Sequence, residues 1–371
     1  MTELTDNRNG GGCVSCGDRA LNGESACAGC AERGCNFSSA DNNGVLIGII
    51  GGFGGMGSLF RGVFERAGIE VICSGVNTFY SNRYLAAKCD VVIVSVPIHE
   101  TIKVIEEIAP IMNKNQLLCD FTSIKTAPVE AMLKSEAQVM GLHPMFGPSV
   151  ASIKGQTIVA SPVRCRDSDK KLLFDIFENE GASVCVMTPQ EHDRVMGIVQ
   201  GLVHFATLSV AEAVRNTLES AKSSGDSLTL DTVISVMSPV YRIEMGLIGR
   251  ILGQDAGLYG DILKMNPAVV PVIEEMSAAV SRLKAIVEDD SKESFEDFDE
   301  FFMTNREAFS SYIPQATADT DKLIVAMTKE ETVKGDKTSE KGEMCEKNGK
   351  NKKCENNEKE AGVTNDAEGR F

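Results

Sequence analysis

A glycine-rich turn between a strand-like and a helix-like segment constrains this chain more than any other feature. The apolar run 45–50 (VLIGII) leads directly into a GxGxxG sequence from Gly52 to Gly57, and helical periodicity begins near residue 56. We expect Gly52 to permit a tight turn, Gly54 to let a pyrophosphate approach the backbone, and Gly57 to let the helix pack closely on the strands. The helix N-terminus would then face the phosphate charge. The glycines alone would also fit an ordinary turn, but strand, turn and helix together predict a dinucleotide-binding loop.

Short apolar strands alternate with helical stretches after this loop. Strands are predicted at 45–50, 70–74, 90–96, 116–121, 156–161 and 182–187. Helices are predicted near 56–67, 98–109, 126–137 and 168–180. This alternation indicates an α/β fold of the Rossmann type, with a doubly wound parallel sheet. After Pro189 the strands stop, and helical periodicity covers 190–220, 228–253, 257–288 and 293–328.

These patterns divide the chain into four segments. Residues 1–43 are rich in Cys and Gly, 44–189 form the dinucleotide-binding domain, and 190–328 form an all-helical domain. Residues 329–371 are mostly Lys, Glu, Asn and Gly, so they cannot bury enough apolar surface to fold. We therefore expect a disordered polar tail from residue 329.

The formal net charge of −16 limits the partners of the chain. Such a charge repels nucleic acid and anionic membranes, and no apolar run reaches the ~18–20 residues of a membrane span. The polar N-terminus has no signal-peptide core. We expect a soluble cytoplasmic protein that binds neither nucleic acid nor membrane. An anionic substrate would need a local cluster of fixed cations.

Twelve cysteines fall into separate groups. Cys13, Cys16, Cys27 and Cys30 form two C-x-x-C pairs, and four thiolates suit tetrahedral zinc. The gap between the pairs is shorter than in the usual zinc ribbon, so free or redox-active thiols are the alternative. Five others lie singly in apolar stretches and are expected to act as small core residues: Cys73, Cys89, Cys119, Cys165 and Cys185.

The end of the second predicted strand does not select between NAD and NADP. An acidic residue is expected there when the ribose 2′-hydroxyl of NAD is held. The chain instead continues from Cys73 as Ser74, Gly75, Val76 and Asn77. Ser74 and Asn77 could bond either a hydroxyl or a 2′-phosphate, or could simply solvate the strand end.

Five further motifs resemble those of the prephenate dehydrogenase family, in order and approximate spacing. They are VIVSVPIHET (92–101), DFTSIK (120–125), GLHPMFGPSV (141–150), QEHDRVMGIVQGLVHFAT (190–207) and SPVYRIEMGLIGR (238–250). The resemblance covers about residues 45–328. It implies oxidative decarboxylation of prephenate to 4-hydroxyphenylpyruvate with NAD or NADP, a step in tyrosine biosynthesis. It also implies a homodimer formed through the helical domain, for which the apolar stretch 268–287 is suited.

The resemblance also implies catalytic roles for two residues. His143 matches the group that accepts a hydrogen bond and a proton from the substrate hydroxyl, and neutral imidazole titrates in the required range. Without the motif, a His-Pro pair would more often shape a loop. Ser123 resembles the residue that bonds both hydroxyl and histidine, whereas capping the next helix is its plain alternative.

Substrate contacts are implied for four residues. Arg250 matches the residue that binds a substrate carboxylate, and Arg242, eight positions earlier and about 80° away on a helix, assists or braces the site. His204 matches a substrate-contacting histidine, although a histidine on an apolar helix face is usually a core residue. Lys125 is expected to support the cofactor or the charged site, with a solvated surface lysine as the alternative. His192 with Asp193 is interpreted as a structural pair at a helix start.

Cofactor contacts are implied for the glycine loop and for the ends of the second and third strands. These residues are Gly52, Phe53, Gly54, Met56, Gly57, Ser74, Ser95 and Pro97. Two alternative functions stay open. One is an arogenate dehydrogenase, whose substrate carries an amino group where prephenate has a keto oxygen. The other is a non-catalytic NAD-sensing regulator with a zinc-ribbon arm.

Overall fold

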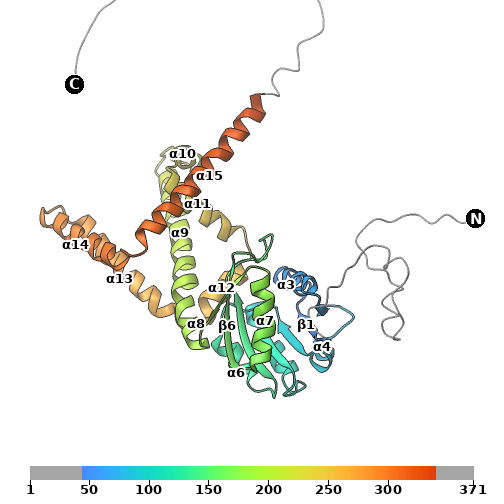
Figure 1. The fold of residues 1–371 in the computed structure, drawn as a ribbon. Helices are drawn as coiled ribbons and strands as arrows, with labels where there is room; N and C mark the ends of the chain where they lie inside the picture. Colours follow the sequence, from blue (N-terminus) through green and yellow to red (C-terminus); the bar gives the residue numbers. More distant parts are fainter. Residues whose placement is uncertain (1–43, 340–371) are drawn as a thin grey trace, which may run out of the picture. The chain divides into compact units, whose positions relative to one another are not determined.

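A seven-stranded sheet organises the first half of the chain in this computed structural model, which describes residues 44–339 (Figure 1). The strands are β1 (Leu46–Ile50), β2 (Glu70–Ser74), β3 (Val91–Val94), β4 (Leu117–Asp120), β5 (Gln138–Pro144), β6 (Thr157–Arg164) and β7 (Ser183–Val186). Their order is β2-β1-β3-β4-β5-β6-β7. Strands β1 to β5 are parallel, β6 runs antiparallel to β5, and β7 is parallel to β6. The predicted Rossmann-type α/β fold is confirmed.

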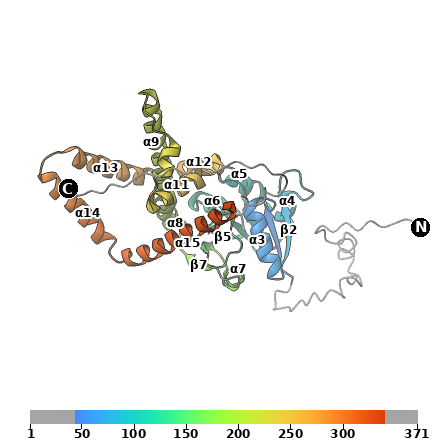
Figure 2. The same cartoon turned by 90° about the horizontal axis from the view of Figure 1, so that it is seen from above.

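Helices cover both faces of this sheet (Figure 2). One face carries α3 (Gly55–Arg66) and α7 (Asp167–Asn179), and the other carries α4 (Asn82–Lys88), α5 (Ile98–Ile108) and α6 (Thr126–Met132). Side chains alternate along each strand. Ile47 and Ile49 therefore pack with Phe60 and Phe64 of α3, whereas Ile50 joins the core on the opposite face. Burial on both faces explains why these strands read as continuous apolar runs.

The described residues after β7 are helical. The helices are α8 (Pro189–Met196), the π-helical segment η1 (Gly197–Leu202), α9 (Val203–Ser223), α10 (Leu230–Ser235), α11 (Pro239–Leu252), α12 (Ala256–Met265) and α13 (Val269–Glu288). A capping box between Thr188 and Glu191, with Pro189 in the first turn, begins α8. Two further helices, α14 (Glu293–Ala308) and α15 (Ile313–Ser339), belong to a separate unit with residues 238–240.

Several predicted boundaries are wrong. Strand β5 and helix α4 were not expected, and the antiparallel pairing of β5 with β6 was not expected in a parallel sheet. A direct loop joins β5 to β6, and a parallel pairing would have required a long crossover. The predicted helices 228–253 and 257–288 are each split. Helix α15 extends to Ser339, whereas the polar tail was expected from residue 329.

The single cysteines are only partly in the core. Cys73, Cys89 and Cys119 are buried as expected, Cys165 is half-buried, and Cys185 is exposed. The prediction for Cys185 is wrong because β7 lies at the edge of the sheet. The paired N-terminal cysteines lie outside the described residues.

The continuous helical run Pro189–Ser223 is long and apolar. Its 35 residues and its best mean hydropathy of 1.4 satisfy the length and composition of a membrane span, and no other helix of the described residues does. A core helix of a soluble protein passes the same test, so this is weak evidence for a membrane. Part of the run forms a wall of the cleft described next.

Candidate active site

A cleft of about 550 Å³ opens where several strands of the sheet end. Its walls come from the glycine loop after β1, the segments that follow β3, β4 and β5, the π-helical segment with α9, and helices α11 and α12. Ligands of open α/β sheets bind at this place, beyond the carboxyl ends of the strands. The cleft is therefore the candidate active site.

His143 lies at the end of β5 and is 2% exposed. Its backbone is fixed by pairing with Val159 of β6. The ring Nδ1 lies 2.8 Å from Nε2 of His192, and the ring Nε2 lies 3.3 Å from Nε2 of Gln200. Burial, together with the positive charges that His192 and Lys125 can carry, holds the pKa of His143 well below its ordinary value. His143 is therefore a neutral ring that faces the cleft.

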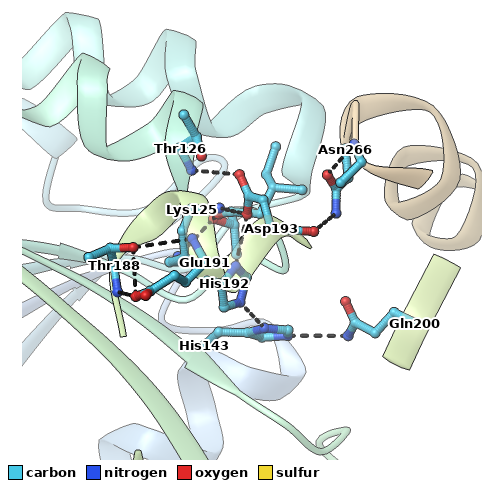
Figure 3. A network of polar contacts seen from close by, with 12 residues as sticks. Lys125, Thr126, His143, Thr188, Glu191, His192, Asp193, Gln200 and Asn266 are labelled. Atoms are coloured by element: carbon cyan, nitrogen blue, oxygen red, sulfur yellow. Dashed lines mark hydrogen bonds and ion pairs between the residues drawn. The ribbon is translucent and has the colours of Figure 1, made fainter. Parts of the chain in front are cut away.

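A second histidine and a carboxylate stand behind His143 (Figure 3). His192 is fully buried, and its Nδ1 lies 2.8 Å from Oδ1 of Asp193. The same carboxylate accepts the backbone N–H groups of Lys125 at 2.7 Å and Thr126 at 2.9 Å. Burial opposes ionisation of Asp193, but these hydrogen bonds prevail and lower its pKa to about 2. The sequence suggested a structural pair here and missed the contact between the two histidine rings.

The π-helical segment and α9 supply Gln200 and His204 to the cleft. Ring contact with Tyr259 of α12, at a centroid distance of 4.9 Å, holds the ring of His204. Gln200 Oε1 and His204 Nδ1 are buried and have no hydrogen-bond partner among the described residues. Buried polar atoms normally have partners. These two atoms are therefore available to a ligand in the cleft.

Ser123 and Lys125 lie in the turn between β4 and α6, but the structure separates them. Ser123 lines the cleft with His143, as the sequence predicts. Lys125 is fully buried, and its Nζ pairs with the equally buried Asp120 and bonds Thr122. It is not among the cleft-lining residues of the described chain. Lys125 was expected to support the cofactor or the charged site, but its charge is paired inside the protein and its side chain lies outside the cleft lining.

The two arginines of α11 differ in their relation to the cleft. Arg250 lines the cleft together with residues of the glycine loop and His143. Arg242 is not among the lining residues and has an interaction partner of its own. Of the two arginines, only Arg250 is among the cleft-lining residues of the described chain. Arg250 is thus placed to pair with an anionic ligand.

The glycine loop has the close contacts that a dinucleotide-binding turn requires. The positive φ of 83° lies at Gly51, one residue before the position that the sequence suggested. A Cβ on Gly52 would lie 2.4 Å from Sγ of Cys73, and one on Gly57 would lie 2.3 Å from the oxygen of Gly51. Gly54 is open except for a single backbone contact. The loop and the N-terminus of α3 therefore fit a pyrophosphate.

Four of the expected cofactor residues line the cleft, namely Gly54, Met56, Ser95 and Pro97. Gly52 and Gly57 shape the loop from within, and Phe53 is 59% exposed. Ser74 is fully buried and its hydroxyl bonds Asn82, so it is not presented to a ribose as we expected. Asn77, the other candidate at this strand end, adopts the left-handed conformation with φ of 59°. The described residues contain no cluster of potential metal ligands.

The fold and the cleft together define a dinucleotide-dependent oxidoreductase with a buried histidine in its cleft. Residues 74–186 match the family model for the prephenate dehydrogenase nucleotide-binding domain, and residues 188–304 match the prephenate dehydrogenase dimerization domain.

Known proteins give the same result. A probable arogenate/prephenate dehydrogenase from Methanocaldococcus jannaschii is 33% identical over 308 residues, which cover 78% of this chain and 66% of that protein. The T-protein of Haemophilus influenzae is 32% identical over 294 residues, covering 79% and 74% respectively. This chain therefore spans about two thirds to three quarters of those relatives. It belongs to the prephenate/arogenate dehydrogenase family.

A solved structure shares the fold. The crystal structure of prephenate dehydrogenase from Aquifex aeolicus, in complex with hydroxyphenyl propionate and NAD+, aligns with a TM-score of 0.53 and 20% identity. The alignment covers 71% of this chain and 98% of that one. At this identity the likeness concerns the fold alone.

Proposed function

We propose that this chain oxidatively decarboxylates prephenate to 4-hydroxyphenylpyruvate in tyrosine biosynthesis, with NAD or NADP as the oxidant. One observation carries the proposal. A buried, neutral His143, a dinucleotide-binding loop and Arg250 all line the same cleft. This combination supports a catalytic role and disfavours a non-catalytic sensor, which would need no base beside the cofactor loop.

The side chains divide the work as follows. Nε2 of His143 accepts the proton of the ring hydroxyl, and Ser123 orients that hydroxyl by a hydrogen bond. Arg250 pairs with a substrate carboxylate through its planar fork. When bound, the oxidised nicotinamide takes the hydride from the carbon that bears the hydroxyl. The bond to the ring carboxylate then breaks, its electron pair completes the aromatic ring, and His143 returns its proton to the phenolate oxygen.

We propose that NADP is usable as well as NAD. The stretch from Ser74 to Asn77 contains no carboxylate, so nothing at the end of β2 repels a 2′-phosphate. Relatives named as NADP(+)-dependent prephenate dehydrogenases occur in Schizosaccharomyces pombe and Saccharomyces cerevisiae, at 24% and 26% identity. These names support the use of NADP.

Arogenate is the second candidate substrate. The Methanocaldococcus relative is named for both substrates. The two differ only in an amino or keto group on the side chain, away from the reacting ring hydroxyl. The same cleft chemistry therefore serves either one.

The test is a steady-state assay of NAD and NADP reduction with prephenate and with arogenate, for the parent and for His143→Ala. We expect prephenate turnover, and a loss of about 10²–10⁴-fold in kcat for the variant with little change in cofactor KM, as for a positioned base. His99→Ala is the matched control, because His99 is 54% exposed and pairs with Asp261. Turnover of arogenate alone would transfer the proposal to that substrate. A His143→Ala variant within threefold of the parent would remove the histidine from the mechanism.

Two further proposals concern assembly and metal. We propose a homodimer through the helical domain, supported by its match to a dimerization domain. We also propose that Cys13, Cys16, Cys27 and Cys30 bind one structural zinc, which elemental analysis of the purified chain would test.

A further inference from the structure

We propose that His192 and Asp193 act behind His143 as a proton relay, which fixes the tautomer of His143 and shares the proton that it takes from the substrate. The three side chains form a buried row (Figure 3), and His143 at its end lines the cleft. This inference rests on the proposed function for its kinetic consequences. Its tautomer assignment depends only on the hydrogen bonds of the free protein.

The assignment starts at Asp193. Its two carboxylate oxygens receive the backbone N–H groups of Lys125 and Thr126, which can only donate. The carboxylate is therefore ionised, and its contact with Nδ1 of His192 requires a proton on that nitrogen. Since the buried His192 ring is neutral, its Nε2 carries a lone pair.

The same reasoning determines His143. Nδ1 of His143 lies 2.8 Å from the lone pair on Nε2 of His192, so this Nδ1 carries the proton. Nε2 of His143 is then left with the lone pair on the side of Gln200, whose amide Nε2 is 3.3 Å away. The row thus presents a base, rather than a donor, to the cleft. With the opposite tautomer, His143 would be unable to accept the hydroxyl proton.

The row can also hold the positive charge that His143 acquires when it takes the substrate proton. Protonation of His143 at Nε2 would create a buried imidazolium, which desolvation disfavours. The proton on Nδ1 can move to Nε2 of His192, because the two nitrogens are in hydrogen-bond contact. The charge then lies beside the Asp193 carboxylate, and attraction at this distance is strong in a buried setting.

Other charged groups near the rings do not replace Asp193. Lys125 opposes a positive charge on either histidine, and Asp120 favours it at His192. Those two are paired with each other and fully buried. Asp193, with a direct bond to His192, is the carboxylate positioned for the relay.

The substitution His192→Gln tests whether His192 takes part in proton transfer or only holds His143 in place. The Gln amide oxygen can still accept the Nδ1 proton of His143 and keep the tautomer, but an amide cannot take up that proton. We expect kcat to fall by about 10²-fold, the lower end of what positioned proton transfer contributes, while both KM values change little. Without the nearby carboxylate to share its charge, His143 is harder to protonate. The acid limb of the kcat/KM profile should therefore move to lower pH.

Asn266→Leu is the matched control. Asn266 is buried and donates to the backbone oxygen of Asp193, and its side-chain hydrogen bonds go to backbone groups rather than to either ring. If the row were merely structural, this variant and His192→Gln would reduce activity in the same way, with the acid limb unmoved in both. Parent-like melting of His192→Gln would exclude unfolding as the cause. An unshifted limb with parent-like kcat would overturn the relay.

A second measurement does not depend on substrate. Nitrogen-15 NMR of the histidine rings in the free protein should show protonated Nδ1 and unprotonated Nε2 for both His143 and His192. Protonated Nε2 on His143 would overturn the proposal even in an enzyme that turns over prephenate. Failure of the proposed function would appear instead as inactivity toward both substrates with these tautomers intact.

Discussion

Arg250 supplies the permanent positive charge among the residues that line the cleft. A hydrogen bond to a charged group contributes ~1.5–3 kcal/mol, which corresponds to roughly 10–150-fold in affinity. We therefore expect Arg250→Ala to raise the prephenate KM by about this factor and to leave the cofactor KM nearly unchanged. Because the residue is exposed on its helix, thermal stability should be preserved.

Arg250→Lys is the conservative comparison. An ammonium group keeps the charge but not the planar fork, so it should restore only part of the affinity. An unchanged prephenate KM in Arg250→Ala would mean that another cation holds the carboxylate, and Arg242 would be tested next. Steady-state kinetics with prephenate varied at saturating cofactor distinguishes these outcomes.

The buried pair of Lys125 and Asp120 leads to a prediction about stability rather than binding. Removing one partner of a buried ion pair leaves an uncompensated charge and costs ~3–5 kcal/mol. Lys125→Met should lower the free energy of unfolding by about this amount, as measured by urea denaturation. The double variant Lys125→Met with Asp120→Asn should regain most of this free energy, because neither member of the pair then carries a buried charge. A stable single variant with a raised substrate KM would restore the original expectation that Lys125 contacts the ligand.

At the level of residues, the sequence identified the residues that line the cleft better than the buried residues behind them. Ser123, His143, His204 and Arg250 come from four distant segments, and all line one cleft. The resemblance placed them there, since no local pattern reports which segments meet. Lys125 was misplaced because the sequence does not show whether a lysine points into the protein or out of it. The contact between the two histidines joins residues 49 positions apart, which no local pattern reports.

The π-helical segment η1 is the element that sets the position of Gln200. Gly197 and Gly201 face the start of α13, and a Cβ on Gly201 would lie 2.6 Å from Cγ2 of Val269. Gly201→Ala should therefore force η1 and α13 apart, at a cost of ~1–3 kcal/mol for overpacking. A displacement of about 1 Å at the catalytic groups can reduce the rate by ~10²-fold. We expect a lower kcat together with a lower melting temperature.

Gly246→Ala on α11 is the control for this prediction. A Cβ at that position meets nothing within 4 Å. Alanine is favoured over glycine in a helix by ~0.5–1 kcal/mol, so this variant should be slightly more stable and fully active. If Gly201→Ala behaved in the same way, the close packing of η1 on α13 would not be what positions the cleft residues.

Strands and helices were predictable where the hydrophobic periodicity is strong and turn-forming residues mark their ends. Six of the seven strands and helices α3, α5, α6 and α7 were found, because short apolar runs alternate clearly with amphipathic stretches. Helix boundaries at Pro239 and at Asn266 were missed, although proline commonly ends or begins a helix. The π-helical turns of η1 could not be predicted, since their apolar pattern is also consistent with an α-helix and their position depends on packing against α13.

The helical domain exposes several large apolar side chains among the described residues. Ile198, Val199 and Val203 on the helical run, and Val270 and Val280 on α13, are each about half exposed or more. Exposed apolar side chains that gather into a patch usually mark an interface. The helical domain also matches a dimerization domain. Both observations support the stretch 268–287, which the sequence suggested for dimer formation.

We predict that the purified chain has a molar mass of twice 39.9 kDa by light scattering. Val280→Asp should shift it toward the monomer, because an unpaired carboxylate buried in an interface carries a large desolvation cost. Val163→Asp is the matched control, since Val163 is 45% exposed on β6, in the sheet domain. It should remain dimeric. A parent that is monomeric at micromolar concentration would contradict the dimer proposal, and a dimeric Val280→Asp would move the interface away from α13.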